Sequence, residues 1–260
     1  MHRDSSVLDW LILGAVCAFV VGGVVLGLIA AAKRRAATLS FAEQNGFTEL
    51  PDCSSDDSNL FSDPDCDDIP PAGLPELMNQ LSGMIPMEGS ECYQVNNLLV
   101  KHEGSADWCM FDYIATFGSG KDRHDECLGV LLARLPLILP EVELQPATLL
   151  SGLEKHLGMQ DIDFESVEFN KRYVVRASSQ KEAFEIMNPK IIDLMLRFPV
   201  RHWHFRETFI LIVIPQSFDP YDALRAMEEI REVVANFDHY VVEQYGFSPK
   251  WPPLLSPVPT

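Results

Sequence analysis

The longest apolar stretch of the chain covers residues 11–32, which contain no charged side chain and are followed directly by Lys33, Arg34 and Arg35. At about 1.5 Å of rise per residue, a helix of this length reaches roughly 33 Å, whereas the hydrocarbon core of a bilayer is about 30 Å thick. The stretch therefore predicts a single transmembrane helix that follows a short N-terminal tail, residues 1–10.

The three basic residues also predict the orientation of this helix. Cationic residues accumulate on the cytoplasmic side of membrane proteins, and the N-terminal flank carries only Arg3 and the terminal amine against Asp4 and Asp9. We therefore expect a single-pass protein of the cell inner (plasma) membrane, with its N-terminus outside and its C-terminal domain in the cytoplasm. The alternative is a cleaved signal peptide, which fits less well because the apolar run is long and the cations follow it.

Two lines of small residues with a spacing of four follow the predicted transmembrane helix. Small side chains at this spacing allow two helix backbones to approach closely in lipid, although glycine and alanine are common in any transmembrane helix. They are the candidate residues for a homodimer through this helix. The two lines are Gly14, Ala18 and Gly22, and Gly23, Gly27 and Ala31.

After the basic residues, the pattern predicts a juxtamembrane helix over 33–50 and an acidic linker over 51–75. The helical pattern stops at Asn45 and Gly46, a pair that is typical of helix C-termini. The linker is rich in Asp, Ser and Pro and poor in branched apolar residues, a composition that does not support a packed core.

From residue 76 to residue 246, short apolar segments alternate with turn sequences and predict one soluble α+β domain. Seven segments have strand character, and they are 92–101, 108–117, 127–135, 141–144, 172–177, 201–205 and 208–214. The first three predict an antiparallel meander, and the last two predict a hairpin. The predicted fold is therefore a mostly antiparallel sheet of about seven strands that is packed by helices.

The clearest helix of this domain is the last one. Asp219 and Pro220 begin it, apolar residues recur at every third or fourth position, and Gly246 ends it. We expect this long amphipathic C-terminal helix to pack on the sheet, with a partner-binding groove as the alternative. Residues 247–260 predict an extended proline-rich tail. Three shorter helices are predicted at 147–157, 180–187 and 189–197.

The charge of the chain restricts its partners. The formal net charge is −18 at pH 7, and residues 36–90 contain no Lys or Arg. A surface this acidic repels phosphate backbones, so we exclude nucleic acid and expect the lipid bilayer and another protein as partners. The six cysteines include no C-x-x-C pair and indicate free thiols in a reducing compartment.

The sequence FESVEFNKRYVV at residues 164–175 resembles a motif of uncharacterised bacterial membrane proteins. Those proteins have one or two N-terminal transmembrane helices before an α+β domain with an F-N-x-x-[FY]-x-V strand, a short helix and a helix that begins with proline. The corresponding residues here are Phe169, Asn170, Tyr173, Val175 and Pro189. The resemblance implies the same order of parts but no activity. Packing explains the motif, since the apolar residues of one strand parity can face the core while Asn170 staples a neighbouring turn.

No catalytic or cofactor-binding residue is predicted. The sequence GSGK at residues 118–121 lacks the spacing of a phosphate-binding loop and predicts a hairpin turn, and neither a nucleophile elbow nor a helical zinc motif occurs. His202 and His204 could face one side of a strand and bind a metal, and His124 and Cys127 form a second pair. A metal site needs three or four converging ligands, so we expect ordinary strand and turn residues here, with no metal and no cofactor.

Taken without a structure, the sequence predicts a membrane-anchored interaction, scaffold or sensor domain that acts without catalysis. The alternative is a membrane-tethered enzyme or small-ligand-binding domain whose site is assembled from residues distant in sequence. An exposed apolar patch would favour the first interpretation, and a set of convergent polar groups would favour the second.

Overall fold

The structure is a computed structural model of the whole chain, and for part of the range 4–31 it describes the backbone alone. The residues that it describes are 4–55, 72–86, 90, 92–118, 120–149, 159–217, 219–247 and 254–255. The chain divides into two compact units, Met1–Asn45 and Gly46–Thr260.

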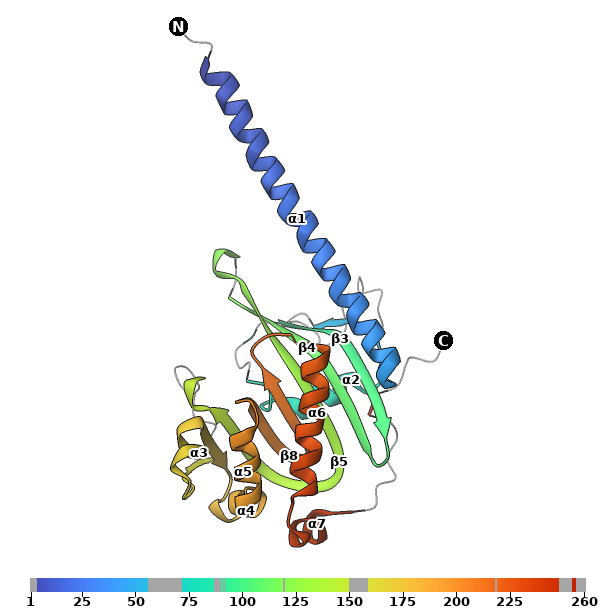
Figure 1. Cartoon of the computed structure of the whole chain (residues 1–260), viewed down its shortest axis with the longest axis vertical. Helices are drawn as coiled ribbons and strands as arrows, with labels where there is room; N and C mark the ends of the chain where they lie inside the picture. The colour runs from blue at the N-terminus through green and yellow to red at the C-terminus, as the bar shows by residue number, and fades with distance from the viewer. Residues whose placement is uncertain are drawn as a thin grey trace. The chain divides into compact units, whose positions relative to one another are not determined.

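The first unit is formed by helix α1 (Asp4–Asn45), which is drawn in blue in Figure 1. It joins the predicted transmembrane segment, 11–32, to the predicted juxtamembrane helix without a break, and it ends at Asn45 as predicted. Gly46 then has a φ of 71°, a left-handed conformation that glycine adopts without strain. Among the described residues, no helix has both the length and the apolar character that crossing a membrane requires. The transmembrane segment therefore stays a prediction.

The second unit confirms the predicted α+β class and contains an antiparallel sheet of eight strands. The strands are β1 (Thr48–Glu49), β2 (Cys53–Ser55), β3 (Cys92–Glu103), β4 (Ala106–Phe117), β5 (His124–Pro146), β6 (Gln160–Ile162), β7 (Tyr173–Ala177) and β8 (His202–Ile214). Their order is β1-β3-β4-β5-β7-β6, with β2 also paired to β3 and β8 also paired to β5. Two of these strands, β1 and β2, lie in segments that the sequence assigned to the juxtamembrane helix and the linker.

Strand β5 is the centre of this sheet. It has 23 residues and unites the two separately predicted strands 127–135 and 141–144. The pairing register with β8 shifts between Arg134 and Val142, so the strand bends there. Prolines are tolerated at such irregular positions because the ladder hydrogen bonds are already interrupted.

Strand β8 corrects the predicted hairpin of 201–205 with 208–214. Both segments belong to one strand of 13 residues that pairs with β5 along its length. Glu207 has a φ of 52° and lies opposite Leu139, where the register shifts. The residues between the two segments therefore form a bulge that bends β8 together with β5, instead of a turn that reverses the chain.

Each face of the sheet is covered by a helix. Helix α2 (Leu74–Leu81) packs with alternate residues of the strands, among them Phe111 of β4 and Leu211 of β8. Helix α6 (Pro220–Ala235) buries Met227 and Ile230 and lies along β8 and β5 in Figure 1. The alternation of side chains in strands explains why both faces are apolar and buried.

Three short helices pack together at one end of the sheet, beside β7 (Figure 1). They are α3 (Val167–Arg172), α4 (Gln180–Ile186) and α5 (Pro189–Arg197). Side chains cap all three N-termini, and the predicted cap Asn188 accepts from the Ile191 N–H at 3.0 Å.

Helix α3 corrects the predicted strand in the F-N-x-x-[FY]-x-V motif. Phe169 belongs to this helix, and only the part from Tyr173 onward is a strand. The Ser166 side chain accepts from the Phe169 N–H, a helix-capping contact that the strand prediction overlooked. The predicted staple is confirmed, since Asn170 donates to the Phe164 carbonyl at 2.7 Å and accepts from its N–H at 3.1 Å.

The predicted long C-terminal helix is two helices, α6 and α7 (His239–Tyr245). Asp219 caps α6 and Gly246 follows α7, so both predicted ends are confirmed. The break lies at Asn236, whose side chain bonds to the Glu232 carbonyl at 2.9 Å and competes with the helical backbone.

Two predicted segments fall largely outside the described residues. Of the predicted helix 147–157, the structure describes the short 3-10 helix η2 (Ala147–Leu149). Of the predicted linker 51–75, residues 56–71 lie outside the described part. The predicted turn at 118–121 does connect β4 to β5, with the 3-10 helix η1 (Gly120–Asp122) inside it.

Candidate functional site

Polar side chains gather on one face of the sheet where β5, β7 and β8 lie side by side. Glu143 of β5 is paired in register with Arg176 of β7 and His204 of β8. Residues that are directly paired in a ladder share a face, and so do residues two positions apart in one strand. We call this set the polar cluster, and its members are Glu141, Glu143, Gln145, Arg176, His202, His204 and Arg206.

Most of the polar cluster is removed from solvent. Glu143, Gln145 and His204 are each 1% exposed, and His202 is 4% exposed. Residues of the opposite parity, including Leu144 and Trp203, enter the apolar core instead. Burying charged groups is costly unless they find partners, so the contacts within the cluster decide whether the arrangement is stable.

The contacts of Glu143 use one of its two carboxylate oxygens. Gln145 Nε2 donates to Oε1 at 2.6 Å, and His202 Nε2 lies 3.6 Å from the same oxygen. The other oxygen, Oε2, is buried without a hydrogen-bond partner among the described residues. An acceptor left in this state costs free energy and requires an explanation.

The contacts of His204 show the same asymmetry. Its Nε2 lies 3.3 Å from Glu141 Oε1, whereas its Nδ1 is buried without a hydrogen-bond partner in the described part of the chain. The bond to His204 holds the pKa of Glu141 below its ordinary value; burial opposes this, and the charge of Arg206 adds to it. Because Glu141 is ionised, it favours the tautomer of His204 that carries the proton on Nε2.

Three members of the polar cluster converge as metal ligands would. Glu143, His202 and His204 each offer one ligand atom, and these atoms lie within 4.8 Å of one another. The sequence singled out the two histidines because they are two apart on a strand, but it missed Glu143. The strand 141–144 was predicted, and its alternation placed two carboxylates on one face; only the pairing with β8 shows that this face meets the histidines.

The second candidate metal pair, His124 and Cys127, is not brought together. The two residues are three positions apart in β5 and therefore lie on opposite faces. His124 stacks on Phe117, and Cys127 Sγ contacts Ser217 Oγ at 3.2 Å. These are contacts with the neighbouring strand β4 and with the segment that follows β8.

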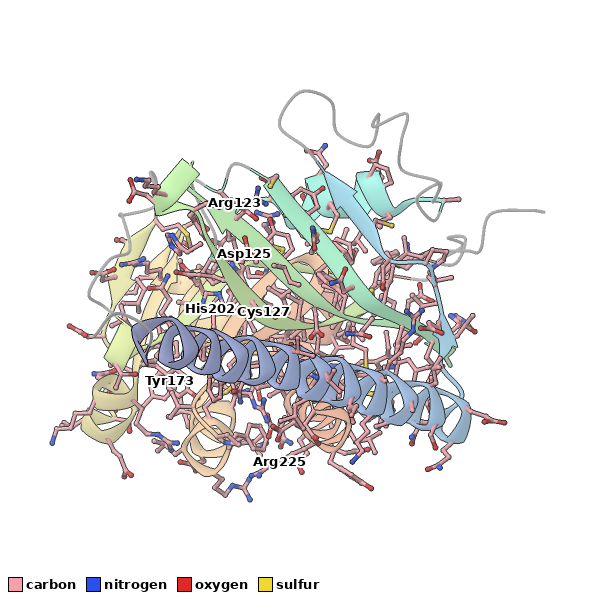
Figure 2. The ribbon with its side chains drawn as sticks, turned by 90° about the horizontal axis from the view of Figure 1, so that it is seen from above. Arg123, Asp125, Cys127, Tyr173, His202 and Arg225 are labelled. Carbon is pink, nitrogen blue, oxygen red and sulfur yellow. The ribbon has the colours of Figure 1, made fainter. Side chains whose placement is uncertain are left out.

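A separate buried ion pair connects α6 with the residue before β8. Arg201 Nε lies 3.3 Å from Glu229 Oε2, and both side chains are nearly inaccessible. Burial raises the pKa of Glu229, and the charges of Arg201 and Arg225 reduce that shift only in part. Figure 2 shows Arg225 at the outer edge of the domain and His202 further inside. The pair is distinct from the polar cluster, because alternation directs Arg201 to the α6 face.

A surface cleft of about 310 Å³ lies between α6 and the β3–β4 hairpin. Its wall is mainly apolar and includes Trp108, Leu135 and Ile230. Arg231 lies 5.1 Å above the Trp108 ring and forms an ion pair with Glu103, so one side of the cleft is charged. Burial alone would raise the pKa of Glu103, but the hydrogen bonds from Lys101 and Arg231 hold it below its ordinary value.

Large apolar side chains are exposed where α7 meets the bend of β5. Residues 137 and 246 form a β-bridge, and the Phe247 N–H donates to the Pro136 carbonyl at 3.1 Å. The exposed fractions of the side chains around this junction range from 38% to 57%. We call this set the α7 patch, and its members are Ile138, Tyr240, Val242 and Phe247.

The residues predicted for membrane contact all lie in α1. The backbones of Gly14, Ala18, Gly22, Gly23, Gly27 and Ala31 are helical, and the side-chain surroundings are described for Gly22 and Gly23 among them. A Cβ at either of these two positions would have no neighbour within 4 Å. Lys33, Arg34 and Arg35 are exposed on the same helix. These observations leave helix association as a prediction.

Comparison with known proteins gives a fold relationship. No family model and no curated protein matches the chain. Among solved structures, the chain is similar to the crystal structure of the mycobacterial trehalose monomycolate transport factor A, TtfA. The similarity has a TM-score of 0.50 at 11% sequence identity and covers 86% of this chain and 97% of that one. Identity this low shows a common fold alone, and the resemblance to uncharacterised bacterial membrane proteins stays a prediction.

Proposed function

We propose that this chain is a membrane-anchored interaction protein whose α+β domain binds another protein and performs no catalysis. Helix α1 would hold it in a bacterial inner membrane, with the domain on the cytoplasmic side. The observation that carries this proposal is the α7 patch, because large apolar side chains exposed near one junction of a folded domain are typical of surfaces that bind partners. Tyrosine and phenylalanine supply large contact area with few rotatable bonds, which is why aromatic residues are enriched at interfaces.

The surroundings of the α7 patch indicate the chemistry of the partner. Asp238, which precedes α7, and Glu243 of α7 are exposed, and Glu185 of α4 accepts a hydrogen bond from Tyr245 at 2.7 Å. An apolar surface with an acidic margin complements a segment whose apolar residues are flanked by Lys or Arg. The net charge of −18 extends this preference to the whole molecule.

Two further observations support a role at the membrane. The apolar residues 11–32 lie in one continuous helix with the exposed basic residues that follow them. The structurally similar protein is described as a transport factor, and a factor that acts by binding another molecule is the kind of role that we propose.

Photo-cross-linking in native membranes tests the proposal. A photoreactive phenylalanine analogue at Tyr240 is expected to capture a reproducible protein neighbour, whereas the same analogue at Tyr221, an exposed tyrosine at the start of α6, is not. Val242→Glu in the Tyr240 reporter should abolish the capture by placing a charge in the patch. Equal capture from both positions, or no capture from Tyr240, would contradict the proposal.

A second candidate function, a ligand-binding domain, is favoured by one observation. The polar cluster brings convergent polar groups together, which is the arrangement that the alternative interpretation of the sequence requires. It concerns a different part of the domain from the α7 patch, so both functions can exist in the same protein.

A further inference from the structure

We propose that Glu143, His202 and His204 bind one divalent transition-metal ion of the zinc class. The proposal goes beyond the interaction function above and does not depend on it, because the polar cluster and the α7 patch are separate. Its basis is the convergence of one ligand atom from each residue within 4.8 Å, combined with the unsatisfied atoms of Glu143 and His204 among the described residues.

The unsatisfied atoms are of the kind that a metal ion binds. Glu143 Oε2 and His204 Nδ1 are both buried without hydrogen-bond partners among the described residues. A carboxylate oxygen such as Glu143 Oε2 accepts, and His204 Nδ1 accepts when its Nε2 donates to Glu141, so the two atoms cannot satisfy each other. A cation between them removes both deficits at once, whereas the protein alone would leave each uncompensated.

The hydrogen bonds to the proposed ligand side chains are of the kind found at metal sites. A metal-bound histidine donates its other ring N–H to a carboxylate, which orients the ring and raises its basicity. Glu141 stands in this relation to His204, at 3.3 Å from Nε2. Gln145 fixes Glu143 in the same way by donating to Oε1, which leaves Oε2 for the ion.

The ligand set indicates the metal. Two imidazoles and one carboxylate are typical of zinc and related ions, whereas calcium and magnesium prefer oxygen ligands alone. Three protein ligands leave a fourth tetrahedral position for a water molecule or a small anion. Nη1 of Arg176, which is buried without a hydrogen-bond partner among the described residues, belongs to the same cluster and favours an anionic group there.

The charges of the surroundings allow a dication. Counted as formal charges, Glu141, Glu143 and the Arg176 partner Asp161 are opposed by Arg176 and Arg206. The group then carries one net negative charge, and a dication changes it to one net positive charge. Neither state leaves a large uncompensated charge, which is the condition for burying an ion at this depth.

Cobalt(II) titration of the full chain in detergent micelles tests the proposal. After treatment with a chelator, the wild-type protein is expected to develop the visible absorption of tetrahedral cobalt with about one ion per chain, and zinc should displace it. His204→Gln and Glu143→Gln should lose this absorption. His239→Gln, which changes an exposed histidine on α7, serves as the matched control and should behave as the wild type.

Glu141→Gln tests the supporting contact separately. It keeps all three proposed ligands and removes the carboxylate behind His204, so we expect the cobalt affinity to fall about 10- to 100-fold without loss of stoichiometry. Far-UV circular dichroism shows whether each variant is folded. If a ligand variant does not fold, the cobalt titration of the wild type still shows whether the chain binds the ion.

Absence of cobalt absorption in the wild type would overturn the proposal and leave the contact between His202 and Glu143 as the explanation of the cluster. Unchanged binding by the folded His204→Gln variant would overturn it as well, because the metal would then lie elsewhere. The interaction proposal fails on a different result, the loss of specific capture from Tyr240, so the two can be judged independently.

Discussion

Two buried or partly buried glutamates show how the surroundings of a side chain set its charge. Glu141 receives a hydrogen bond from His204 and lies near Arg206, and its pKa is lowered. Glu229 is paired with Arg201, but burial dominates and its pKa is raised. The same residue type therefore stabilises the fold in one place when it is ionised and in the other when it is protonated.

This difference predicts opposite pH dependences for two neutral variants. The free energy of unfolding of the wild type, compared with that of Glu141→Gln, should rise as the pH increases from the lowered pKa of Glu141 toward the ordinary value of 4.5. It should fall again as the pH decreases through that lowered pKa. Relative to Glu229→Gln, the wild type should lose stability as the pH rises from 4.5 through the raised pKa. Urea unfolding of the full chain at a series of pH values measures both differences, and slopes of the same sign would contradict the prediction.

The sequence predicted individual side-chain contacts correctly where the two partners lie close together in the chain. The cap at Asn188 and the staple at Asn170 were predicted because the partners lie within a few residues. The histidine pair was found for the same reason. Glu143 was missed because its proximity to the histidines depends on strands that are far apart in sequence, and pairing register cannot be derived from one strand alone.

Asn188 connects two helices that are distant in sequence. Its Oδ1 caps α5, and its Nδ2 donates to the Asn236 carbonyl at 3.1 Å, at the break that follows α6. One buried side chain thus satisfies backbone groups at the N-terminus of one helix and the C-terminus of another.

We expect Asn188→Ala to lower the free energy of unfolding by about 1–2 kcal/mol, since the cap is lost. Asn188→Asp retains a capping oxygen but cannot donate to Asn236, so it should lower the free energy of unfolding by less than Asn188→Ala does. Urea unfolding compares the two variants, and Ser179→Ala, which removes the cap of α4, is the control for capping alone. A larger loss for Asp than for Ala would contradict this account.

The bend of β8 depends on one residue in an unusual conformation. Glu207 has a φ of 52°, and its carboxylate side chain is exposed. A left-handed conformation is unfavourable for most residues and especially for β-branched ones, whereas asparagine adopts it more readily.

Glu207→Val should therefore lower the free energy of unfolding by about 1–2 kcal/mol. Glu207→Asn should leave the free energy of unfolding unchanged or raise it slightly, although this variant removes the same charge as Glu207→Val. Thermal or urea unfolding of the two variants gives the comparison, and equal stabilities would show that the bend does not depend on this backbone conformation.

At the scale of elements, the sequence identified most helices and strands but divided the longest ones incorrectly. The prediction ended one strand at residue 135 and began the next at 141, and it placed a hairpin turn between the segments 201–205 and 208–214. Both interruptions are bends that occur opposite each other, so the paired strand stabilises each. Conversely, the regular apolar spacing after residue 219 indicated one helix, while Asn236 ends α6 and α7 begins after it.

At the scale of the whole molecule, the proposed topology separates the residues before α1 from the domain after it. A cysteine introduced at Gln244, an exposed position of α7, should react with a membrane-impermeant maleimide only after cell lysis. Cys53 and Cys109 are buried, and burial raises the pKa of Cys109, but Cys92 and Cys127 are half-buried, so the chain without the added cysteine is the background control. Labelling in intact cells would reverse the proposed orientation.

The position of β5 between three other strands also determines the order in which the domain can be completed during synthesis. The hairpins of β3, β4 and β5 can form as soon as they leave the ribosome, but β8 is translated only after β6, β7 and three helices. Until then, the long edge of β5 that β8 will occupy has unpaired backbone groups and is open to other strands. The nascent chain therefore passes through a stage at which premature termination or slow translation exposes an aggregation-prone edge.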